Sequence, residues 1–263
     1  MSDFVYPPII GLAKTLGRLV GVKVRVEGER NVPAEGGAVV AVNHIGYLDF
    51  VFAGWAADAM RPKRLIRFAA KKEVFDHRLA GPLMRGMHHV PVDRESGAAS
   101  YRDCLKVLKS GELLGMFPEA TISRSFELKD FKTGSTRMAA AAGVPIVPTV
   151  VWGTQRLMTK GRKPDLQRGT TVLVYVGEQL QPARSDDATV VTEELKTRMR
   201  ALLHRAQDDY PPVPAKAGRW WLPQRLGGTA PTLEAASELD RIEVATRLAR
   251  RGGEPTESAG RPT

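Results

Sequence analysis

Short apolar runs alternate with helix-like stretches from Gly21 to Gly177, and this alternation limits the possible folds more than any other feature of the chain. Val22, Val24 and Val26 alternate with charged residues, as in a half-exposed strand. Further apolar runs, typical of buried strands, cover residues 38–42, 65–69, 90–92, 113–117, 146–152 and 171–176. Helix-like stretches between them cover residues 49–60, 73–86, 97–109 and 134–142. This order predicts an α/β fold with a mostly parallel central sheet flanked by helices.

The two ends of the chain differ from this α/β region. Residues 8–20 are typical of an amphipathic helix that begins near Pro8. Its broad apolar face with basic flanks suits a membrane interface, and an ordinary helix packed on the domain is the alternative. After Gly177 a surface helix is expected over 189–207, then three prolines and a weaker helical pattern over 234–251. We therefore expect three parts: an N-terminal amphipathic membrane-surface helix (1–20), the α/β domain (21–210) and a C-terminal helical appendage with a partly disordered tail (211–263).

The chain is basic, with 39 Lys and Arg against 29 Asp and Glu and a formal net charge of +10. Such a charge favours an anionic partner: nucleic acid, an anionic membrane surface or a phosphorylated small molecule. The single cysteine, Cys104, excludes an internal disulfide framework and a multi-cysteine zinc site. Cys104 lies in an amphipathic stretch, so we expect a buried structural thiol.

Membrane association is expected at the surface only. The first residues lack the features of a signal peptide, and the uncharged stretch 4–13 is shorter than the about 20 apolar residues that span a bilayer. Two basic runs (61–72 and 156–168) and the pair Trp220 and Trp221 suit an anionic surface, although a solvated face is the alternative for each run. We expect a peripheral protein on the cytoplasmic face of the cell membrane, without nucleic acid as a partner.

His44 and Asp49 form the first candidate catalytic cluster, within Asn-His-Ile-Gly-Tyr-Leu-Asp. His44 follows a buried strand, Asp49 opens a helix-like stretch, and Gly46 lets the chain turn between them. The carboxylate can then accept a hydrogen bond from one ring nitrogen, which leaves the other nitrogen to take a proton from a substrate hydroxyl. A purely structural pair at a strand-to-helix turn is the alternative.

Two more polar clusters follow predicted strands. Glu119 and Thr121 lie in Phe-Pro-Glu-Ala-Thr, directly after the apolar run that begins at residue 113. Asp93 and Arg94 end the short run 90–92. Because open α/β sheets place their sites at the carboxyl ends of strands, these clusters predict a cleft along one edge of the sheet.

With these clusters in this order, the sequence resembles the glycerolipid acyltransferase superfamily, and within it the bacterial 1-acyl-glycerol-3-phosphate acyltransferases. The resemblance covers about residues 20–180 and includes the segment 26–33 before the first cluster and Val-Pro-Ile-Val-Pro at 144–148. It implies that His44 is the general base that deprotonates the acceptor hydroxyl and that Asp49 orients the ring.

The resemblance also implies how both substrates are used. Arg94 is expected to grip the acceptor's phosphate, a role that suits a guanidinium group, while Glu119 and Thr121 help to position the acceptor. Neither a cofactor nor a metal is implied, since acyl-CoA or acyl carrier protein brings the acyl chain as a co-substrate.

One cluster departs from the family pattern. The family usually reads Phe-Pro-Glu-Gly-Thr-Arg, whereas residues 117–124 read Phe-Pro-Glu-Ala-Thr-Ile-Ser-Arg. Ala120 replaces a glycine, which matters if that position needs a positive φ. Arg124 comes two residues later than the usual arginine, so its reach to the phosphate stays open. Lys132 is a second candidate for that contact, beside a helix expected to begin near residue 134, whose N-terminus favours anions.

We expect an O-acyltransferase that moves a fatty acyl chain to the free hydroxyl of 1-acyl-glycerol 3-phosphate (lysophosphatidic acid), giving phosphatidic acid in phospholipid biosynthesis. The altered cluster leaves another acceptor open, such as glycerol 3-phosphate, a different lysophospholipid or a glycolipid. A non-catalytic basic module that binds membrane or nucleic acid is the alternative from another functional class.

Overall fold

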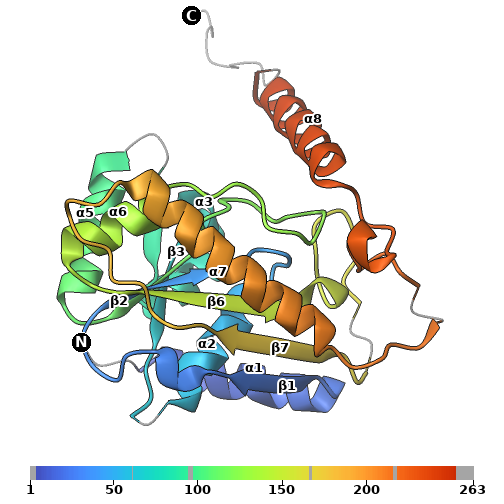
Figure 1. The fold of residues 1–263 in the computed structure, drawn as a ribbon, viewed down its shortest axis with the longest axis horizontal. Coiled ribbons are helices and arrows are strands. Elements are labelled where there is room, and N and C mark those ends of the chain that lie inside the picture. Colours follow the sequence, from blue (N-terminus) through green and yellow to red (C-terminus); the bar gives the residue numbers. More distant parts are fainter. Residues whose placement is uncertain (1–3, 61, 94–96, 166–167, 216–217, 253–263) are drawn as a thin grey trace, which may run out of the picture.

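A seven-stranded sheet crosses the centre of the molecule, with strand order β1-β7-β6-β2-β5-β3-β4 (Figure 1). It is seen in a computed structural model that describes the chain except residues 1–3, 61, 94–96, 166–167, 216–217 and 253–263. The strands are β1 (Lys23–Glu27), β2 (Ala38–Val42), β3 (Ile66–Lys71), β4 (Val90–Val92), β5 (Leu113–Met116), β6 (Ile146–Trp152) and β7 (Thr171–Val176). Neighbouring strands are parallel except β6 and β7, which confirms the mostly parallel α/β sheet.

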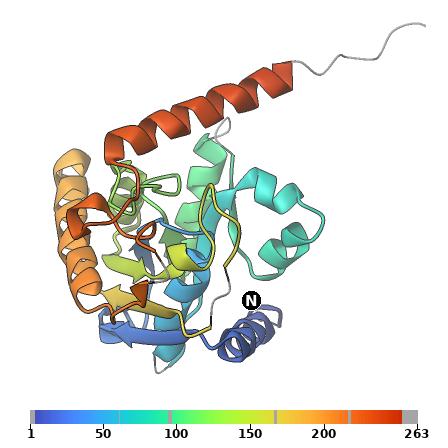
Figure 2. The same ribbon diagram turned by 90° about the vertical axis from the view of Figure 1, so that its right-hand side faces the viewer.

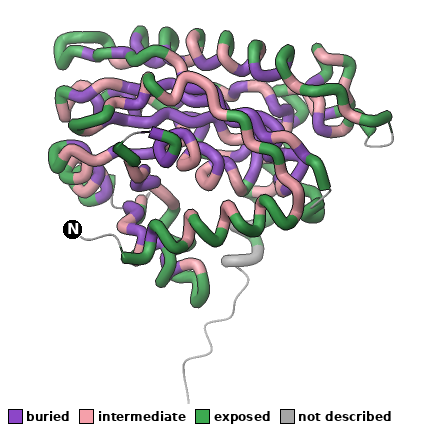
Figure 3. Tube along the Cα trace, turned by 90° about the horizontal axis from the view of Figure 1, so that it is seen from below, coloured by how far each residue is buried: buried purple, intermediate pink, exposed green. Residues whose placement is uncertain are grey.

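Helices cover both faces of this sheet. They are α1 (Tyr6–Val20), α2 (Asp49–Ala59), α3 (Lys72–Asp76), α4 (Ala80–Gly86), α5 (Gly97–Lys109), α6 (Gly134–Ala142), α7 (Ala188–Asp208) and α8 (Leu233–Gly252), with short 3-10 turns η1 (Glu29–Asn31), η2 (Thr154–Arg156) and η4 (Gln224–Leu226). Helices α5, α6 and α7 pack on one face and α2 on the other. Figure 3 shows the buried strands enclosed between helices whose outer surfaces are exposed.

Strand β2 shows why the continuous apolar runs become central strands. Val39 and Ala41 face the core under α5 to α7, whereas Ala38, Val40 and Val42 face the core under α2. All five residues are buried. A strand covered on both faces needs apolar side chains at every position, which the sequence supplies here.

The stretch 73–86, expected as one helix, is two helices in the structure. Helix α3 ends at Asp76 and α4 begins at Ala80. Between them His77 has extended backbone, and its Nδ1 atom accepts from the backbone N–H groups of Leu79 and Ala80 at 3.3 Å each. Pro82 then falls in the first turn of α4, where its missing N–H is tolerated.

Helix α1 packs on α3 and α4 through one side and leaves leucines on the other. Tyr6 is buried and donates from its hydroxyl to the Ile66 carbonyl oxygen at 2.8 Å. Leu12, Leu16 and Leu19 remain 58%, 52% and 67% exposed. Among the described residues, no helix is both long and apolar enough to span a bilayer.

Several basic and aromatic residues expected at a membrane surface belong to the interior instead. Trp221 is buried beside Trp152 and Tyr210, with the guanidinium of Arg156 5.0 Å from its ring centre. The expectation that Trp221 lies at the headgroup level is therefore wrong, because its indole packs into the hydrophobic core beside Trp152 of β6. Arg67 is buried as well, with an ion pair to a glutamate.

The C-terminal helix α8 leaves the body of the sheet and lies across the loops at one end of it. Figures 1 and 2 place α8 at the opposite side of the molecule from α1. The tail expected after residue 252 lies outside the described part of the chain.

Candidate active site

The functional side chains gather where three neighbouring parallel strands end. Strand β2 lies between β5 and β6 and runs parallel to both, so the three carboxyl ends share one edge of the sheet. His44 follows β2, Phe117 and Glu119 follow β5, and Thr154 follows β6. Polar residues that follow two of the predicted strands and β6 therefore lie at one edge of the sheet.

His44 and Asp49 are in direct contact. The Nδ1 atom of His44 lies 2.9 Å from Oδ2 of Asp49. The same oxygen accepts the backbone N–H groups of Ile45 at 2.7 Å and Gly46 at 2.8 Å. Asp49 is the first residue of α2, so its carboxylate closes the strand-to-helix turn and fixes the imidazole at once. The contact expected between the Asp49 carboxylate and one ring nitrogen of His44 is therefore present.

A residue from another strand completes the environment of Asp49. The hydroxyl of Thr154, just after β6, donates to Oδ1 of Asp49 at 2.5 Å. The Asp49 side chain is fully buried, and its four donors offset the removal of this carboxylate from water. A Cβ on Gly46 would come within 2.8 Å of the Met158 carbonyl oxygen, which explains why this turn takes glycine.

The imidazole of His44 packs against an aromatic ring and remains partly exposed to solvent. Its ring stacks on Phe117, with 4.1 Å between ring centres and an interplanar angle of 22°. The His44 side chain is 21% exposed, and among the described residues its Nε2 atom has no hydrogen-bond partner. One nitrogen is therefore fixed by Asp49 and the other is left to meet a substrate.

Glu119 joins the two loops of the site. Its Oε1 atom accepts the backbone N–H of His44 at 2.8 Å, and its Oε2 atom accepts that of Lys129 at 3.0 Å. Glu119 is 3% exposed. Burial raises the pKa of this carboxyl to about 8, against the opposing effect of the two N–H donors and Lys129.

Ala120 adopts the backbone conformation that its position in the cluster suggested. Its φ is +60°, in the left-handed region where a Cβ is disfavoured. The position occupied by glycine in the family pattern therefore needs a positive φ, and alanine meets that need with some strain.

The remaining predicted site residues are spread along the loop after β5. The hydroxyl of Thr121 accepts from Nζ of Lys129 at 3.3 Å. Lys132 is exposed and lines the groove beside Glu119, just before α6. Arg124 turns toward α8 and binds acidic residues there. Arg94 lies outside the described residues, so its contact with a phosphate stays a prediction.

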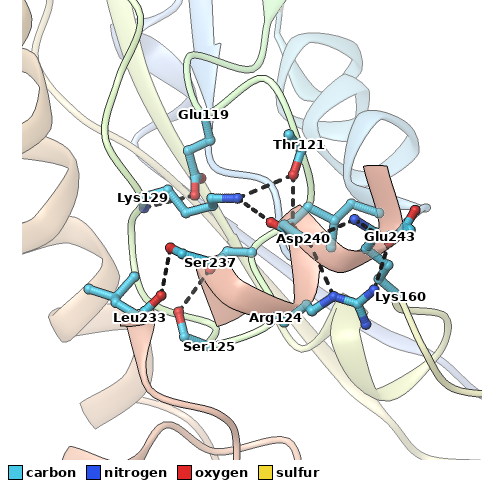
Figure 4. Close-up of polar contacts among 12 residues, drawn as sticks. Glu119, Thr121, Arg124, Ser125, Lys129, Lys160, Leu233, Ser237, Asp240 and Glu243 are labelled. Carbon is cyan, nitrogen blue, oxygen red and sulfur yellow. Dashed lines mark hydrogen bonds and ion pairs between the residues drawn. The ribbon is translucent and has the colours of Figure 1, made fainter. Parts of the chain in front are cut away.

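Two lysines that lie close to these residues were not singled out from the sequence. Lys129 and Lys160 both reach Asp240 of α8, at 2.5 Å and 2.8 Å, as Figure 4 shows. Lys160 belongs to a basic run expected on a membrane-facing surface, and no spacing in the sequence marked it for the site. Burial by itself raises the pKa of Asp240, but the hydrogen bonds and charges of the two lysines outweigh it and lower the pKa to about 2.

A groove of about 1090 Å³ runs beside the loop after β5. Glu119, Thr121, Lys129 and Lys132 line one side, and the first turns of α8 line the other. Among the described residues, no group of three or more His, Cys, Asp and Glu side chains could hold a metal ion. The site offers a histidine, a carboxylate that holds one of its ring nitrogens, and several cations beside a groove.

Known proteins are similar to this chain in part of their sequence and in fold. Residues 23–152 match the family model described as Acyltransferase. The chain is 31% identical to 1-acyl-sn-glycerol-3-phosphate acyltransferase of Bacillus subtilis (strain 168) over 189 residues, which are 68% of this chain and 87% of that protein. It is 32% identical over 176 residues to the 1-acyl-sn-glycerol-3-phosphate acyltransferase of Limnanthes douglasii, covering 65% of this chain and 58% of that longer protein.

The fold is shared with a solved structure. The 1-acyl-sn-glycerophosphate (LPA) acyltransferase PlsC from Thermotoga maritima superposes with a TM-score of 0.65, over 78% of this chain and 81% of that one. The two sequences are 22% identical, so this likeness concerns the architecture.

Proposed function

This chain belongs to the acyltransferase family, and we propose that it moves a fatty acyl chain from an acyl thioester to the free hydroxyl of 1-acyl-glycerol 3-phosphate, giving phosphatidic acid. The observation that carries the proposal is the pair formed by His44 and Asp49, with 2.9 Å between Nδ1 and Oδ2. The proteins named 1-acyl-sn-glycerol-3-phosphate acyltransferase in bacteria and plants supply the class of acceptor.

The chemistry follows from the two nitrogens of His44. The Nε2 atom takes the proton of the acceptor hydroxyl while the hydroxyl oxygen attacks the thioester carbonyl carbon. Asp49 accepts from Nδ1–H and stabilises the imidazolium that forms. When the carbon–sulfur bond breaks, the leaving thiolate takes the proton back from Nε2. One ester bond forms, one thioester bond breaks and the histidine returns to its neutral state.

The acceptor's phosphate meets the basic residues beyond Glu119. Arg124 and Lys132, with Thr121, lie on the loop that carries Glu119, and this loop lines the groove. Glu119 acts as a positioning residue, because its two oxygens accept the backbone N–H groups of His44 and Lys129 and so fix these two loops relative to each other. Arg94 belongs to the same set by resemblance.

The acyl donor is acyl-CoA or acyl carrier protein, and the enzyme works at the cytoplasmic face of the membrane as a peripheral protein. The outward leucines of α1 support this placement, and Leu79 and Leu83 at α4 are also exposed, at 77% and 48%. Apolar side chains exposed on a helix next to basic residues suit insertion at the lipid headgroup level. Vesicle sedimentation tests this placement: we expect stronger binding to anionic than to neutral vesicles, and equal binding would contradict it.

The test of the reaction is turnover by the His44→Ala variant. Removing a general base lowers rates by about 10²–10⁴-fold, so we expect almost no phosphatidic acid from labelled acyl-CoA and 1-acyl-glycerol 3-phosphate. Circular dichroism and urea unfolding establish that the variant is folded. A folded His44→Ala protein that consumes thioester at the normal rate contradicts the mechanism.

A panel of acceptors tests the substrate. We expect 1-acyl-glycerol 3-phosphate to give a higher kcat/KM than glycerol 3-phosphate, other lysophospholipids or a glycolipid. A higher kcat/KM for one of the other acceptors would change the proposed acceptor and would leave the proposed role of His44 unchanged.

A further inference from the structure

Three cations of the site converge on two carboxylates of α8. Asp240 lies 2.5 Å from Lys129, 2.8 Å from Lys160 and 3.3 Å from Arg124. Glu243 lies 2.7 Å from Arg124 and 2.8 Å from Lys160. Figure 4 shows the carboxylates pointing from α8 into this cluster.

The contacts of this cluster are those of an anion-binding site. Carboxylate and phosphate oxygens accept the same charge-assisted hydrogen bonds from ammonium and guanidinium groups. The side chains of Arg124, Lys129 and Lys160 are only 17–18% exposed, so α8 covers most of them. Three positive charges held this close together need an anion between them, and in this structure α8 provides it.

The cluster is connected to the catalytic pair. Lys129 donates from its backbone to Glu119, and Glu119 accepts from the backbone of His44 on its other oxygen. Lys129 also contacts the hydroxyl of Thr121. A phosphate bound by the same cations would therefore lie on the loop that positions the base.

The docking of α8 depends mainly on charge. Among the α8 residues whose side chains are described, Ala236 is the buried apolar one. Leu239, Ile242 and Val244 are 43%, 54% and 53% exposed. Burial of apolar surface thus holds α8 only weakly. Each partly exposed ion pair shifts an equilibrium by at most about fivefold and weakens in salt, so a competing anion can displace the helix.

We propose that α8 is an autoinhibitory lid: Asp240 and Glu243 occupy the place where Arg124, Lys129 and Lys160 hold the phosphate group of a phosphomonoester acceptor, and α8 leaves when that group binds. This inference rests on the proposed function for the identity of the acceptor. It assigns Lys129 and Lys160 to phosphate binding beside Arg124, and Lys160 lies beyond the residues that match the family model.

The first test is kinetic and uses the full chain with Asp240→Asn and Glu243→Gln together. An acceptor that binds only the open form has an apparent Kd equal to its intrinsic Kd divided by the fraction of enzyme that is open. We expect the double variant to lower KM for the acceptor by about tenfold, since two carboxylates are neutralised. Its kcat at saturating acceptor stays close to that of the unmodified chain. An unchanged or higher KM overturns the lid, as does a loss of kcat.

A matched control comes from the same helix. Glu238 pairs with Arg241 along α8, at 3.0 Å, and its side chain is 55% exposed. Glu238→Gln and Asp240→Asn each remove one negative charge from α8, but only the second faces the cations. We expect Asp240→Asn alone to lower KM and Glu238→Gln to leave it unchanged. Equal effects would mean that net charge matters and the specific contacts do not, which overturns the proposal.

The second test needs no acyl transfer. Hydrogen exchange of α8 amides is measured in the unmodified chain with glycerol 3-phosphate and with sodium chloride at the same ionic strength. We expect glycerol 3-phosphate to speed exchange in residues 236–246 by at least about fivefold. Equal exchange in both salts overturns the lid. If glycerol 3-phosphate opens α8 in a protein that transfers no acyl group, the lid stands and the proposed reaction fails.

Discussion

Replacing Asp49 by asparagine removes one negative charge from the site and leaves its shape almost unchanged. An amide oxygen in the place of Oδ2 still accepts from the Nδ1 atom of His44 and from the backbone of Ile45 and Gly46. The amide NH₂ in the place of Oδ1 donates to the hydroxyl of Thr154, which can turn to accept. We expect the free energy of unfolding to fall by only about 1 kcal/mol, the difference between charged and neutral hydrogen bonds.

The effect on catalysis is much larger because the lost charge faces the imidazolium. With 2.9 Å between Nδ1 and Oδ2, the charge centres are about 4 Å apart and attract by about 4 kcal/mol at an effective dielectric constant of about 20. This attraction develops only as His44 takes the proton, so it acts on the transition state. At 1.36 kcal/mol for each factor of ten, kcat falls by about 10³-fold while KM changes little.

Initial rates with labelled acyl-CoA and 1-acyl-glycerol 3-phosphate measure this loss, alongside urea unfolding of the same preparations. Thr154→Val is the matched control, because it removes one donor to Asp49 and keeps the charge. We expect this control to lose more stability than Asp49→Asn, about 1–3 kcal/mol for an unpaired buried acceptor, and at most about tenfold in kcat. If Asp49→Asn keeps kcat within tenfold of the unmodified enzyme, the electrostatic argument is refuted.

Three further predictions concern the loops of the site. Gly46→Ala places a Cβ 2.8 Å from the Met158 carbonyl oxygen, so urea unfolding should show a loss of about 1–3 kcal/mol and kcat should fall with it; an unchanged stability contradicts the close approach. Ala120→Gly relieves a φ of +60° and should leave stability equal or up to about 1 kcal/mol higher, whereas Ala140→Gly inside α6 should lower it by about 1 kcal/mol. Burial raises the pKa of Glu119 from 4.5 to about 8. Between these pH values the folded chain therefore keeps a proton that the unfolded chain releases. The stability that this proton contributes is complete below pH 4.5 and is lost as the pH rises to 8, by about 1.4 kcal/mol per pH unit. Glu119→Gln lacks this slope, and parallel stability curves for the two proteins would contradict the raised pKa.

The sequence predicted the strands best where burial leaves few choices. The runs 38–42, 146–152 and 171–176 coincide with β2, β6 and β7, because strands in the middle of a covered sheet must be apolar throughout. Strand β3 extends past its expected end to Lys71, since pairing with β4 continues to that residue. Such pairing depends on a neighbour that is distant along the chain, and local patterns do not contain it.

The same distinction applies to the site. The contact between His44 and Asp49 could be predicted because the turn between them is local, and a six-residue segment contains both partners. Thr154 was missed because it reaches Asp49 only when β6 lies beside β2. Lys160 was expected at a membrane surface, since a basic run has the same composition whether it faces lipid headgroups or a carboxylate of the same chain.

The acidic residues of α8 are synthesised long after the other residues of the site. His44 and Asp49 are five positions apart, whereas Arg124 and Asp240 are separated by 116. A ribosome makes the chain from the N-terminus, so the base and its partner can assemble long before α8 has emerged. Until then the three cations are without the carboxylates that later cover them. A nascent chain of this protein therefore presents an open anion site to the cell, and the finished chain closes it by itself.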